Sequence, residues 1–345
     1  MRTRSYFIMT FKIVVVLYLF VNTVTAQHGK INGLSVVAPP VEFTSDPFPR
    51  IKETNADWVC LIPYGYNGIG STDVRYNLDR QWWGEREVGV RESITLAQKN
   101  NLKTFLKPQV YVPGSWPGDI EFDTEEDWLA WEKSYREFIL FYVDIASSYD
   151  VDMFCIGTEF KKSIQQRPQY WRNLIKEIRD IYCGQLTYSA NWDSYHLATF
   201  WDALDYIGIS AYFPLVDERE PSVRKIKSAW KPIVTELSRS SKKFNRPILF
   251  TEYGYLTVEG TTYENWKLEK IIDQLSVNEK AQADALEAMY SVFSKKDFWA
   301  GGFLWKWFPN NMGHEGYMLK DYTPKDKIAE DVLKKWLSSL HLVQV

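Results

Sequence analysis

The stretch ILFTEYGY at residues 248–255 is a run of strand-forming apolar residues that ends in a carboxylate between aromatic side chains. A second stretch, FCIGTEF at residues 154–160, has the same order of an apolar run, then Thr-Glu, then an aromatic residue. A carboxylate that directly follows a buried strand costs several kcal/mol if it is desolvated and unpaired. Glu159 and Glu252 therefore indicate a fold in which the ends of buried strands open onto a shared polar site.

The apolar runs of the chain predict eight strands. They cover residues 31–38, 58–64, 102–110, 151–159, 185–191, 205–212, 247–253 and 299–307. Segments with helical periodicity separate the runs, which is typical of βα units and a parallel sheet. No glycine-rich phosphate loop follows the first run, which disfavours the alternative of an open doubly wound sheet. The fold class is thus predicted to be α/β, as a single (β/α)8 TIM barrel.

Several helix boundaries carry local signals. Thr124 with an acidic residue three positions later resembles a capping box, and Pro168 suits the first turn of a helix. The S-x-x-E pattern at 276–279 predicts a further helix start, and Thr323 with the proline after it predicts the start of the last helix. Pro232 falls inside a helical pattern, so that helix is expected to kink or restart there.

The N-terminal segment has the pattern of a secretory signal peptide. Basic residues at positions 2, 4 and 12 precede an apolar run at 13–21 and a small residue, Ala26. A membrane span needs about 20 apolar residues, so an uncleaved anchor is the less favoured alternative. We therefore expect a signal peptide at 1–26, a barrel domain at 27–345, and a secreted protein, extracellular or periplasmic, with no membrane attachment after cleavage.

Charge and composition exclude several classes of function. The chain has a formal net charge of −3, and loss of the three basic residues of the signal peptide makes it more acidic, so nucleic acid is not an expected partner. Cys60 and Cys155 lie in apolar runs and Cys183 stands alone, which favours buried or free thiols over a disulfide framework. The four histidines are scattered without metal-ligand spacing, so we expect no metal and no other cofactor.

The positions of the two glutamates suggest a chemistry. In a (β/α)8 barrel the active site lies at the C-terminal ends of the strands, and Glu159 and Glu252 close the fourth and seventh strands. A carboxyl pair that flanks a bond suits glycoside hydrolysis, with retention or inversion decided by the separation of the two groups. A single glutamate at a strand end is more often solvated or ion-paired, but the matched pair favours catalysis.

Other side chains at the predicted strand ends fit a sugar site. Tyr212 is expected to hydrogen-bond one carboxylate, and Asn191 to contact sugar hydroxyl groups. Lys107 has two equal interpretations, a contact with a sugar hydroxyl or an internal ion pair with a carboxylate of the mouth. Five tryptophans are candidate platforms for the apolar faces of sugar rings: Trp82, Trp83, Trp192, Trp305 and Trp307.

Four motifs together resemble a known family. They are IGTEF (156–160), ISAYFPL (209–215), TEYGY (251–255) and GGFLWKWFP (301–309). Their order is similar to that of the clan A retaining glycoside hydrolases, and most similar to glycoside hydrolase family 113, whose known activity is endo-β-1,4-mannanase. This resemblance implies that Glu159 is the general acid/base and Glu252 the nucleophile. The clan usually has Asn before the acid/base, in contact with the sugar 2-hydroxyl, and here Thr158 occupies that position.

The predicted function is therefore a secreted retaining endo-β-mannanase that cleaves mannan or glucomannan through a covalent glycosyl-enzyme. Its partner is a polysaccharide or oligosaccharide substrate, and we expect a monomer. Two alternatives remain. The barrel acts on another β-glycan, such as cellulose or mixed-linkage glucan, or it binds carbohydrate without catalysis, which the presence of both glutamates disfavours.

Overall fold

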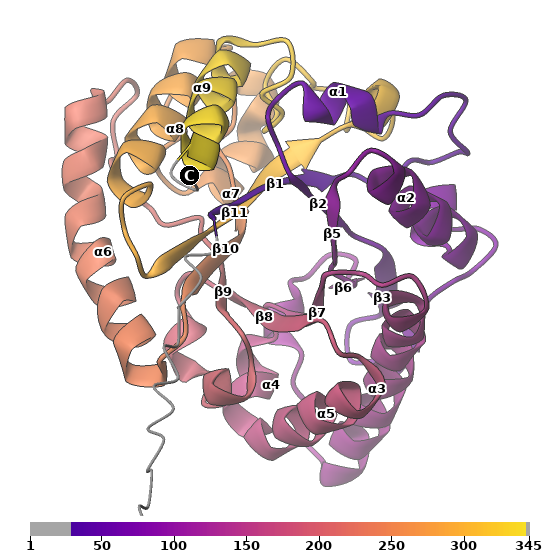
Figure 1. The fold of residues 1–345 in the computed structure, drawn as a ribbon. Coiled ribbons are helices and arrows are strands. Elements are labelled where there is room, and N and C mark those ends of the chain that lie inside the picture. Colours follow the sequence, from indigo (N-terminus) through magenta and orange to yellow (C-terminus); the bar gives the residue numbers. More distant parts are fainter. Residues whose placement is uncertain (1–28, 343–345) are drawn as a thin grey trace, which may run out of the picture.

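The computed structural model describes residues 29–342, with side chains described as far as residue 340. Eight parallel strands close into a barrel in the order β1-β11-β10-β9-β8-β7-β5-β2 (Figure 1). These strands are β1 (Ile31–Val36), β2 (Trp58–Leu61), β5 (Lys103–Leu106), β7 (Met153–Thr158), β8 (Gln185–Asn191), β9 (Ile207–Ser210), β10 (Ile248–Tyr253) and β11 (Trp299–Trp307). The prediction of a single (β/α)8 barrel is confirmed.

Helices surround the barrel and pack on its outer face (Figure 1). The α-helices are α1 (Phe48–Lys52), α2 (Glu87–Lys99), α3 (Glu125–Ser148), α4 (Lys161–Gln166), α5 (Pro168–Ile181), α6 (Val223–Phe244), α7 (Asn265–Leu268), α8 (Glu279–Phe293) and α9 (Ile328–Leu342). Short 3-10 helices lie in the loops: η1 (Trp83–Glu85), η2 (Pro117–Asp119), η3 (Tyr195–Leu197), η4 (Trp201–Ala203), η5 (Glu269–Gln274) and η6 (Pro309–Asn311).

The helix-start predictions are confirmed at two positions. The Thr124 side chain accepts a hydrogen bond from the Asp127 amide (3.1 Å) at the start of α3, and Pro168 is the first residue of α5. Pro232 lies inside α6, which continues through it without the predicted restart. The proline is on the exposed side of the helix, where water satisfies the carbonyl that loses its partner.

Two other helix starts were predicted wrongly. The cap of α8 is Asn278, whose side chain accepts from the Ala281 amide at 2.9 Å, and not Ser276. An Asn side chain at this position competes well for the free amides of the first turn. The last helix begins at Ile328, because the segment from Thr323 to Lys327 is first held in turns by Asp321 and by its own carbonyls.

A second, smaller sheet stands on the barrel and was not predicted. It contains β3 (Tyr64–Asn67), β4 (Val74–Arg75) and β6 (Gln109–Tyr111), in the order β4-β3-β6. The predicted strands 58–64 and 102–110 are each divided in two, at Pro63 and at Pro108. Proline has no N–H to donate to the barrel ladder, so the chain leaves the barrel wall at both sites and pairs again above it.

The core has two layers. Inside the barrel, a cluster that includes Phe105, Leu249 and Phe303 fills the interior, while a larger cluster rich in tryptophan packs between the strands and the helices. Cys60 and Cys155 are buried free thiols in the interior, as predicted, and Cys183 is exposed and free. The filled interior leaves the C-terminal mouth as the place where polar side chains from different strands meet.

Within residues 29–342, no helix combines the length and the apolar character that a membrane crossing requires. The predicted signal peptide at 1–26 lies outside the described residues, so its cleavage and the secretion of the protein stay predictions.

Candidate active site

Glu159 and Glu252 meet at the mouth of the barrel. Glu252 belongs to β10, where it is in register with Ser210 of β9, and Ser210 is one of the groups that lower the pKa of Glu159. Glu159 directly follows β7, and its amide donates to the Ser189 carbonyl of β8 at 2.8 Å. Two segments that are about 90 residues apart in sequence thus bring their carboxyl groups close enough for the charge of Glu252 to act on Glu159.

The backbone at Glu159 has a conformation that is rare outside glycine. Its φ is +61°, in the left-handed region, where a residue with a side chain is strained. This conformation ends β7, and the Lys161 amide then turns back onto the Glu159 carbonyl at 2.7 Å as α4 begins. Strain of this kind persists where the surrounding structure over-determines it, and it clusters at functional sites.

Three donors surround the Glu252 carboxylate. The Lys107 ammonium forms an ion pair with its Oε1 atom, and Gln109 Nε2 donates to the same oxygen at 2.6 Å. The Tyr212 hydroxyl donates to Oε2 at 3.1 Å, as the sequence predicts. Burial and the negative charge of Glu252 raise the pKa of Tyr212 well above its usual range, so this tyrosine keeps its proton for donation. All three contacts hold the two Glu252 oxygens in a fixed orientation.

Of the two interpretations of Lys107, the structure shows the ion pair. Its side chain is fully buried, with the ammonium 5.9 Å from the centre of the Trp305 ring, so it is closed off from a sugar hydroxyl. Burial is the largest single influence and on its own lowers the pKa of Lys107, but the charge and hydrogen bond of Glu252 and the nearby Cys60 and Cys155 together outweigh it, so the pKa is raised. Lys107 is therefore a charged partner of Glu252.

Glu159 has different surroundings. Its Oε2 atom accepts one hydrogen bond at 2.6 Å from Nε1 of Trp116, the residue that precedes the short helix η2. Burial raises the pKa of Glu159, and the negative charge of Glu252 raises it further, against the lowering effect of the bonds from Trp116 and Ser210. Glu159 therefore keeps its proton to higher pH than an ordinary glutamate while Glu252 carries its charge.

The sequence reasoning missed Gln109, Trp116 and Ser210. Gln109 stands two residues after Lys107, and a period of two is the signal that places side chains on one face of an extended segment. Trp116 lies in a loop in which Pro and Gly indicate only a turn. The contact of Ser210 depends on how β9 lies against its neighbours, which the local sequence does not show.

Thr158 and Asn191 lie near the carboxyl pair, but their polar groups face protein atoms. Thr158 is largely buried, with its hydroxyl 3.9 Å from the Cys155 sulfur. The Asn191 amide donates to Asp193 at 3.0 Å, and Asp193 is ion-paired with Lys161 at 2.7 Å. Contacts of Thr158 and Asn191 with a sugar stay predictions.

Three of the five candidate tryptophan platforms have accessible ring surface. Trp82 is 42% exposed, and Trp192 and Trp305 are partly buried. Trp192 stacks on Trp266 of α7, with ring centres 5.9 Å apart and planes 26° apart. Trp266 was not predicted as part of the site, and it extends the aromatic surface on this side of the mouth.

The prediction of a sugar platform is wrong for the other two tryptophans. Trp83 packs edge-on against Phe43 and is buried, and Trp307 is 1% exposed beneath the Arg50 guanidinium. The pairing of β11 with β1 shifts register between Trp305 and Trp307. Such an irregularity breaks the simple alternation of faces, so two tryptophans two residues apart lie in different environments.

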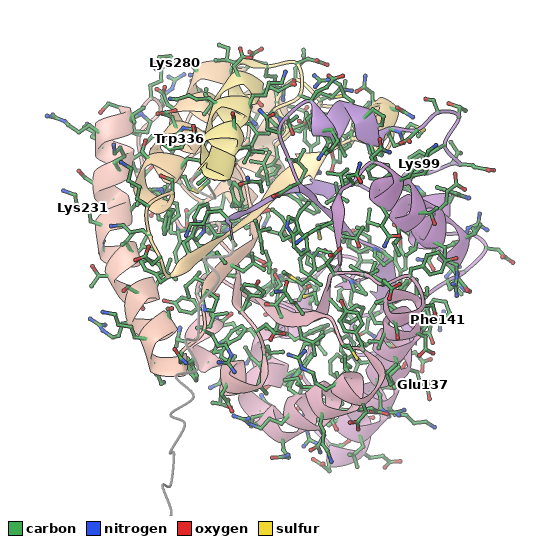
Figure 2. All side chains as sticks on the ribbon, in the orientation of Figure 1. Lys99, Glu137, Phe141, Lys231, Lys280 and Trp336 are labelled. Atoms are coloured by element: carbon green, nitrogen blue, oxygen red, sulfur yellow. The ribbon has the colours of Figure 1, made fainter. Side chains whose placement is uncertain are left out.

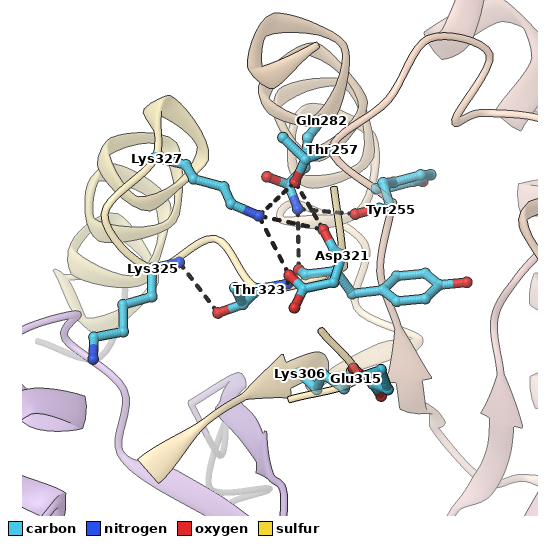
Figure 3. A network of polar contacts seen from close by, with 10 residues as sticks. Tyr255, Thr257, Gln282, Lys306, Glu315, Asp321, Thr323, Lys325 and Lys327 are labelled. Atoms are coloured by element: carbon cyan, nitrogen blue, oxygen red, sulfur yellow. Dashed lines mark hydrogen bonds and ion pairs between the residues drawn. The ribbon is translucent and has the colours of Figure 1, made fainter. Parts of the chain in front are cut away.

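A polar network supports the loop that follows β11 (Figure 3). Lys306, next to Trp305, is buried and forms an ion pair with Glu315. Further along the loop, Lys327 contacts Asp321 at 3.3 Å and the Thr257 hydroxyl at 2.7 Å. These contacts join the loop after β11 to the segment after β10, and so hold the Trp305 side of the mouth in place.

In the part of the chain that is described, no group of three or more His, Cys, Asp or Glu side chains is arranged to hold a metal ion. The mouth presents two carboxyl groups in different surroundings: Glu252 is held by three donors, and Glu159 has a raised pKa. A (β/α)8 barrel with such a pair at its C-terminal mouth has the architecture of a glycoside hydrolase.

Comparison with known proteins gives the family. The profile of Glycoside Hydrolase Family 113 matches residues 42–327. The chain belongs to glycoside hydrolase family 113, and the predicted family assignment is confirmed. No curated protein sequence matches the chain.

Solved structures agree with this assignment. The GH113 β-mannanase AaManA from Alicyclobacillus acidocaldarius, in complex with ManMIm, is 26% identical with a TM-score of 0.79, over 92% of this chain and 100% of that one. A GH113 β-1,4-mannanase is 25% identical with a TM-score of 0.76, over 90% of this chain and 99% of that one. The β-glucuronidase of Ruminococcus gnavus, at 18% identity and a TM-score of 0.60 over 89% of this chain and 50% of its own, shares the fold.

Proposed function

We propose that this glycoside hydrolase is a retaining endo-β-1,4-mannanase, with Glu252 as the nucleophile and Glu159 as the general acid/base. The observation that carries the proposal is the unequal setting of the two carboxyl groups. Glu252 receives three donors, one of them cationic, while burial and the charge of Glu252 raise the pKa of Glu159. Paired carboxyl groups whose surroundings favour opposite protonation states are suited to the roles of nucleophile and acid.

In the first step, Glu159 donates its proton to the oxygen of the glycosidic bond as that bond breaks. The Glu252 carboxylate attacks the anomeric carbon and forms an ester, and the leaving part of the sugar chain departs with the proton. Lys107, Gln109 and Tyr212 hold the Glu252 oxygens in a fixed orientation, so that little reorganisation is needed for the attack.

In the second step, Glu159 changes from acid to base. Formation of the ester removes the negative charge of Glu252, and that charge is one of the causes that raise the pKa of Glu159. The pKa of Glu159 then falls, and its carboxylate takes a proton from a water molecule that attacks the anomeric carbon. The ester breaks, Glu252 regains its charge, and two inversions give a sugar with its original configuration.

The choice of a β-mannan substrate is supported by two similar solved structures that are described as β-mannanases. Trp82, Trp192 and Trp305 offer aromatic surface for sugar rings along the mouth. Another β-glycan is the alternative substrate, since mannose and glucose differ at the 2-hydroxyl and Thr158 stands where the clan usually has Asn. Release of reducing sugar from mannan, glucomannan, cellulose and mixed-linkage glucan separates these substrates.

We also propose that the enzyme is secreted, since the first 26 residues have the pattern of a signal peptide, and that it acts as a monomer. N-terminal sequencing of protein recovered from the culture medium tests cleavage after Ala26. Light scattering of the same material tests the oligomeric state.

Rescue of variants with azide tests the two roles. Glu159→Ala should lose most activity and regain it with azide, which then forms a β-glycosyl azide because it attacks the intact glycosyl-enzyme. Glu252→Ala should be inactive, and azide should give the α-product if it rescues turnover at all. Glu126→Gln, at an exposed position on α3, is the matched control and should keep full activity. Near-normal activity of Glu252→Ala, or mannan binding without hydrolysis by the unaltered protein, would refute the proposal.

A further inference from the structure

A hollow of about 520 Å³ lies on the small sheet beside the carboxyl pair. Residues of β3, β4 and the two loops that follow β4 and β6 line it, and neither Glu159 nor Glu252 is among them. Its volume is in the range of sites that bind small ligands. We call it the side hollow, and none of the contacts described above accounts for it.

The small sheet connects the side hollow with a residue that contacts Glu252. Gln109, which donates to Glu252, is in register with Tyr64 of β3. Two residues further along, Tyr66 is in register with Tyr111, and Tyr66 lines the hollow. At a rise of about 3.3 Å per residue, two residues correspond to roughly 7 Å. The hollow thus begins close enough to the carboxyl pair for one glycan chain to occupy both.

The floor of the side hollow is held by buried polar contacts. The Tyr66 hydroxyl donates to Glu85 at 3.2 Å, and Gln81 donates both to Glu85 at 3.1 Å and to the Tyr64 carbonyl at 2.8 Å. The Asn67 amide donates to two carbonyls of the β3–β4 turn, at 2.8 and 2.9 Å. These contacts form the shape of the hollow before a ligand binds, which lowers the entropy cost of binding.

Two arginines give the side hollow its charge. Arg75 and Arg80 both line it and are exposed, and neither has an ion-pair partner among residues 29–340. Of the eleven other arginines among residues 29–340, four also lack an ion pair (Arg86, Arg224, Arg239 and Arg246), and seven are ion-paired: Arg50, Arg91, Arg136, Arg167, Arg172, Arg179 and Arg219. One acidic side chain, Asp73, lines the hollow, and it forms no ion pair with either arginine. Free guanidinium groups are good donors to carboxylate and to sulfate-like oxyanions.

An aromatic ring stands at the edge of the same hollow. Trp82 lines it and is 42% exposed, and its ring lies close to Gly313 in the loop after β11. A partly exposed tryptophan next to hydrogen-bonding groups suits the apolar face of a sugar ring. The side hollow therefore combines a platform for the sugar with donors for a negatively charged group.

We propose that the side hollow binds a sugar unit that carries a negative charge, a carboxylate or a sulfate ester, on the same glycan chain that the carboxyl pair cleaves. Trp82 stacks on the ring of this unit, and Arg75 and Arg80 contact the charged group. The proposal rests on the proposed function for the rest of the glycan chain. It narrows the substrate class to β-glycans with acidic units and gives the small sheet a role in their selection.

The test is a binding measurement that does not depend on turnover. Glu159→Gln protein is titrated calorimetrically with three oligosaccharides of four β-1,4-linked mannose units. One is neutral, one has a C6 carboxylate on a single unit, and one has a sulfate ester on a single unit. The same titrations are repeated with Arg75→Gln/Arg80→Gln, and with Arg224→Gln/Lys231→Gln as the control of equal charge change. Arg224 and Lys231 are exposed on α6, away from the small sheet, and Lys231 points into solvent (Figure 2).

The proposal expects the charged oligosaccharides to bind about tenfold more tightly than the neutral one, with the difference reduced by salt. The arginine pair variant should lose this preference and keep its affinity for the neutral ligand, whereas the control pair keeps the preference. Trp82→Ala should weaken the binding of all three oligosaccharides by the same factor. The two charged ligands distinguish carboxylate from sulfate. Equal affinity for charged and neutral ligands, or an equal loss in the control pair, would overturn the proposal, whereas absence of mannan hydrolysis would instead overturn the proposed function.

Discussion

Replacing Lys107 by Met removes the cationic partner of Glu252 at a place that water does not reach. The Lys107 side chain is 0% exposed and that of Glu252 is 9% exposed. After the substitution Glu252 keeps two neutral donors, Gln109 and Tyr212, but no positive charge. Breaking a buried ion pair on one side typically costs about 3–5 kcal/mol of stability, because the remaining charge stays desolvated. The two neutral donors place the expected loss near the lower end, at about 3 kcal/mol.

Replacing the other partner of the ion pair should cost a similar amount of stability. Glu252→Gln leaves the Lys107 ammonium buried and unpaired, and a cost of similar size is expected. When both residues are replaced, no isolated charge remains. The double variant should therefore be within about 1 kcal/mol of the unaltered protein, since neutral groups of similar volume often replace a buried ion pair without loss. The coupling energy of the cycle is then several kcal/mol in size.

Urea-induced unfolding at pH 7 measures the free energy of unfolding of the unaltered protein, of the two single variants and of the double variant. Lys103→Met is the control, because Lys103 is an exposed lysine on the same strand, over the ring of Trp58 (5.4 Å), and its loss should cost about 1 kcal/mol or less. The reasoning is refuted if each single variant loses less than about 1 kcal/mol of stability. It is also refuted if the loss in the double variant equals the sum of the two single losses, because Lys107 and Glu252 would then not form a desolvated ion pair. Both Glu252 variants should also be inactive.

Three further predictions concern the acid/base group and one helix cap. Trp116→Phe removes a hydrogen bond that lowers the pKa of Glu159, so the basic limb of kcat/KM should move to higher pH, and an unmoved limb would contradict this. Because the folded-state pKa of Glu159 is raised, its stabilising contribution is complete below pH about 4.5 and is lost as pH rises through the folded value. Glu159→Gln should therefore raise the free energy of unfolding at pH 7 by on the order of 1 kcal/mol, and by less at pH 4, in urea unfolding. Asn278→Ala should cost about 1 kcal/mol of stability in the same assay, whereas Ser276→Ala should cost almost nothing. The opposite result would support Ser276, the residue predicted from sequence, as the cap of α8.

The fold was predictable because its signal is repeated along the chain. Each of the eight apolar runs is a weak signal alone, but eight in alternation with helical segments favour a closed barrel. The errors arose where a local pattern had competitors. Asn278 and Ser276 both suit a helix cap, and only the packing of α8 selects one of them. Pro63 and Pro108 showed where two runs break, but not that the two continuations pair with each other.

The residues of the candidate site also fall into those that the sequence predicted and those that it did not. Glu159 and Glu252 were found from sequence because each directly follows or ends a buried strand, and Tyr212 because it follows a predicted strand, β9, which pairs with β10. Gln109 and Trp116 were missed because their contacts depend on segments that leave the barrel and return over its mouth. Trp307 was wrongly placed at the mouth because a register shift in β11 changes the side it faces.

The sequence by itself determined the barrel, the pair of glutamates and the aromatic character of the mouth, since all three follow from residue order and periodicity. The tertiary structure decided how differently the two glutamates are held: three donors surround the Glu252 carboxyl group, while the pKa of Glu159 is raised. That difference comes from burial and from the donors within about 3 Å of each carboxyl group, and these donors come from strands and loops far apart in the chain.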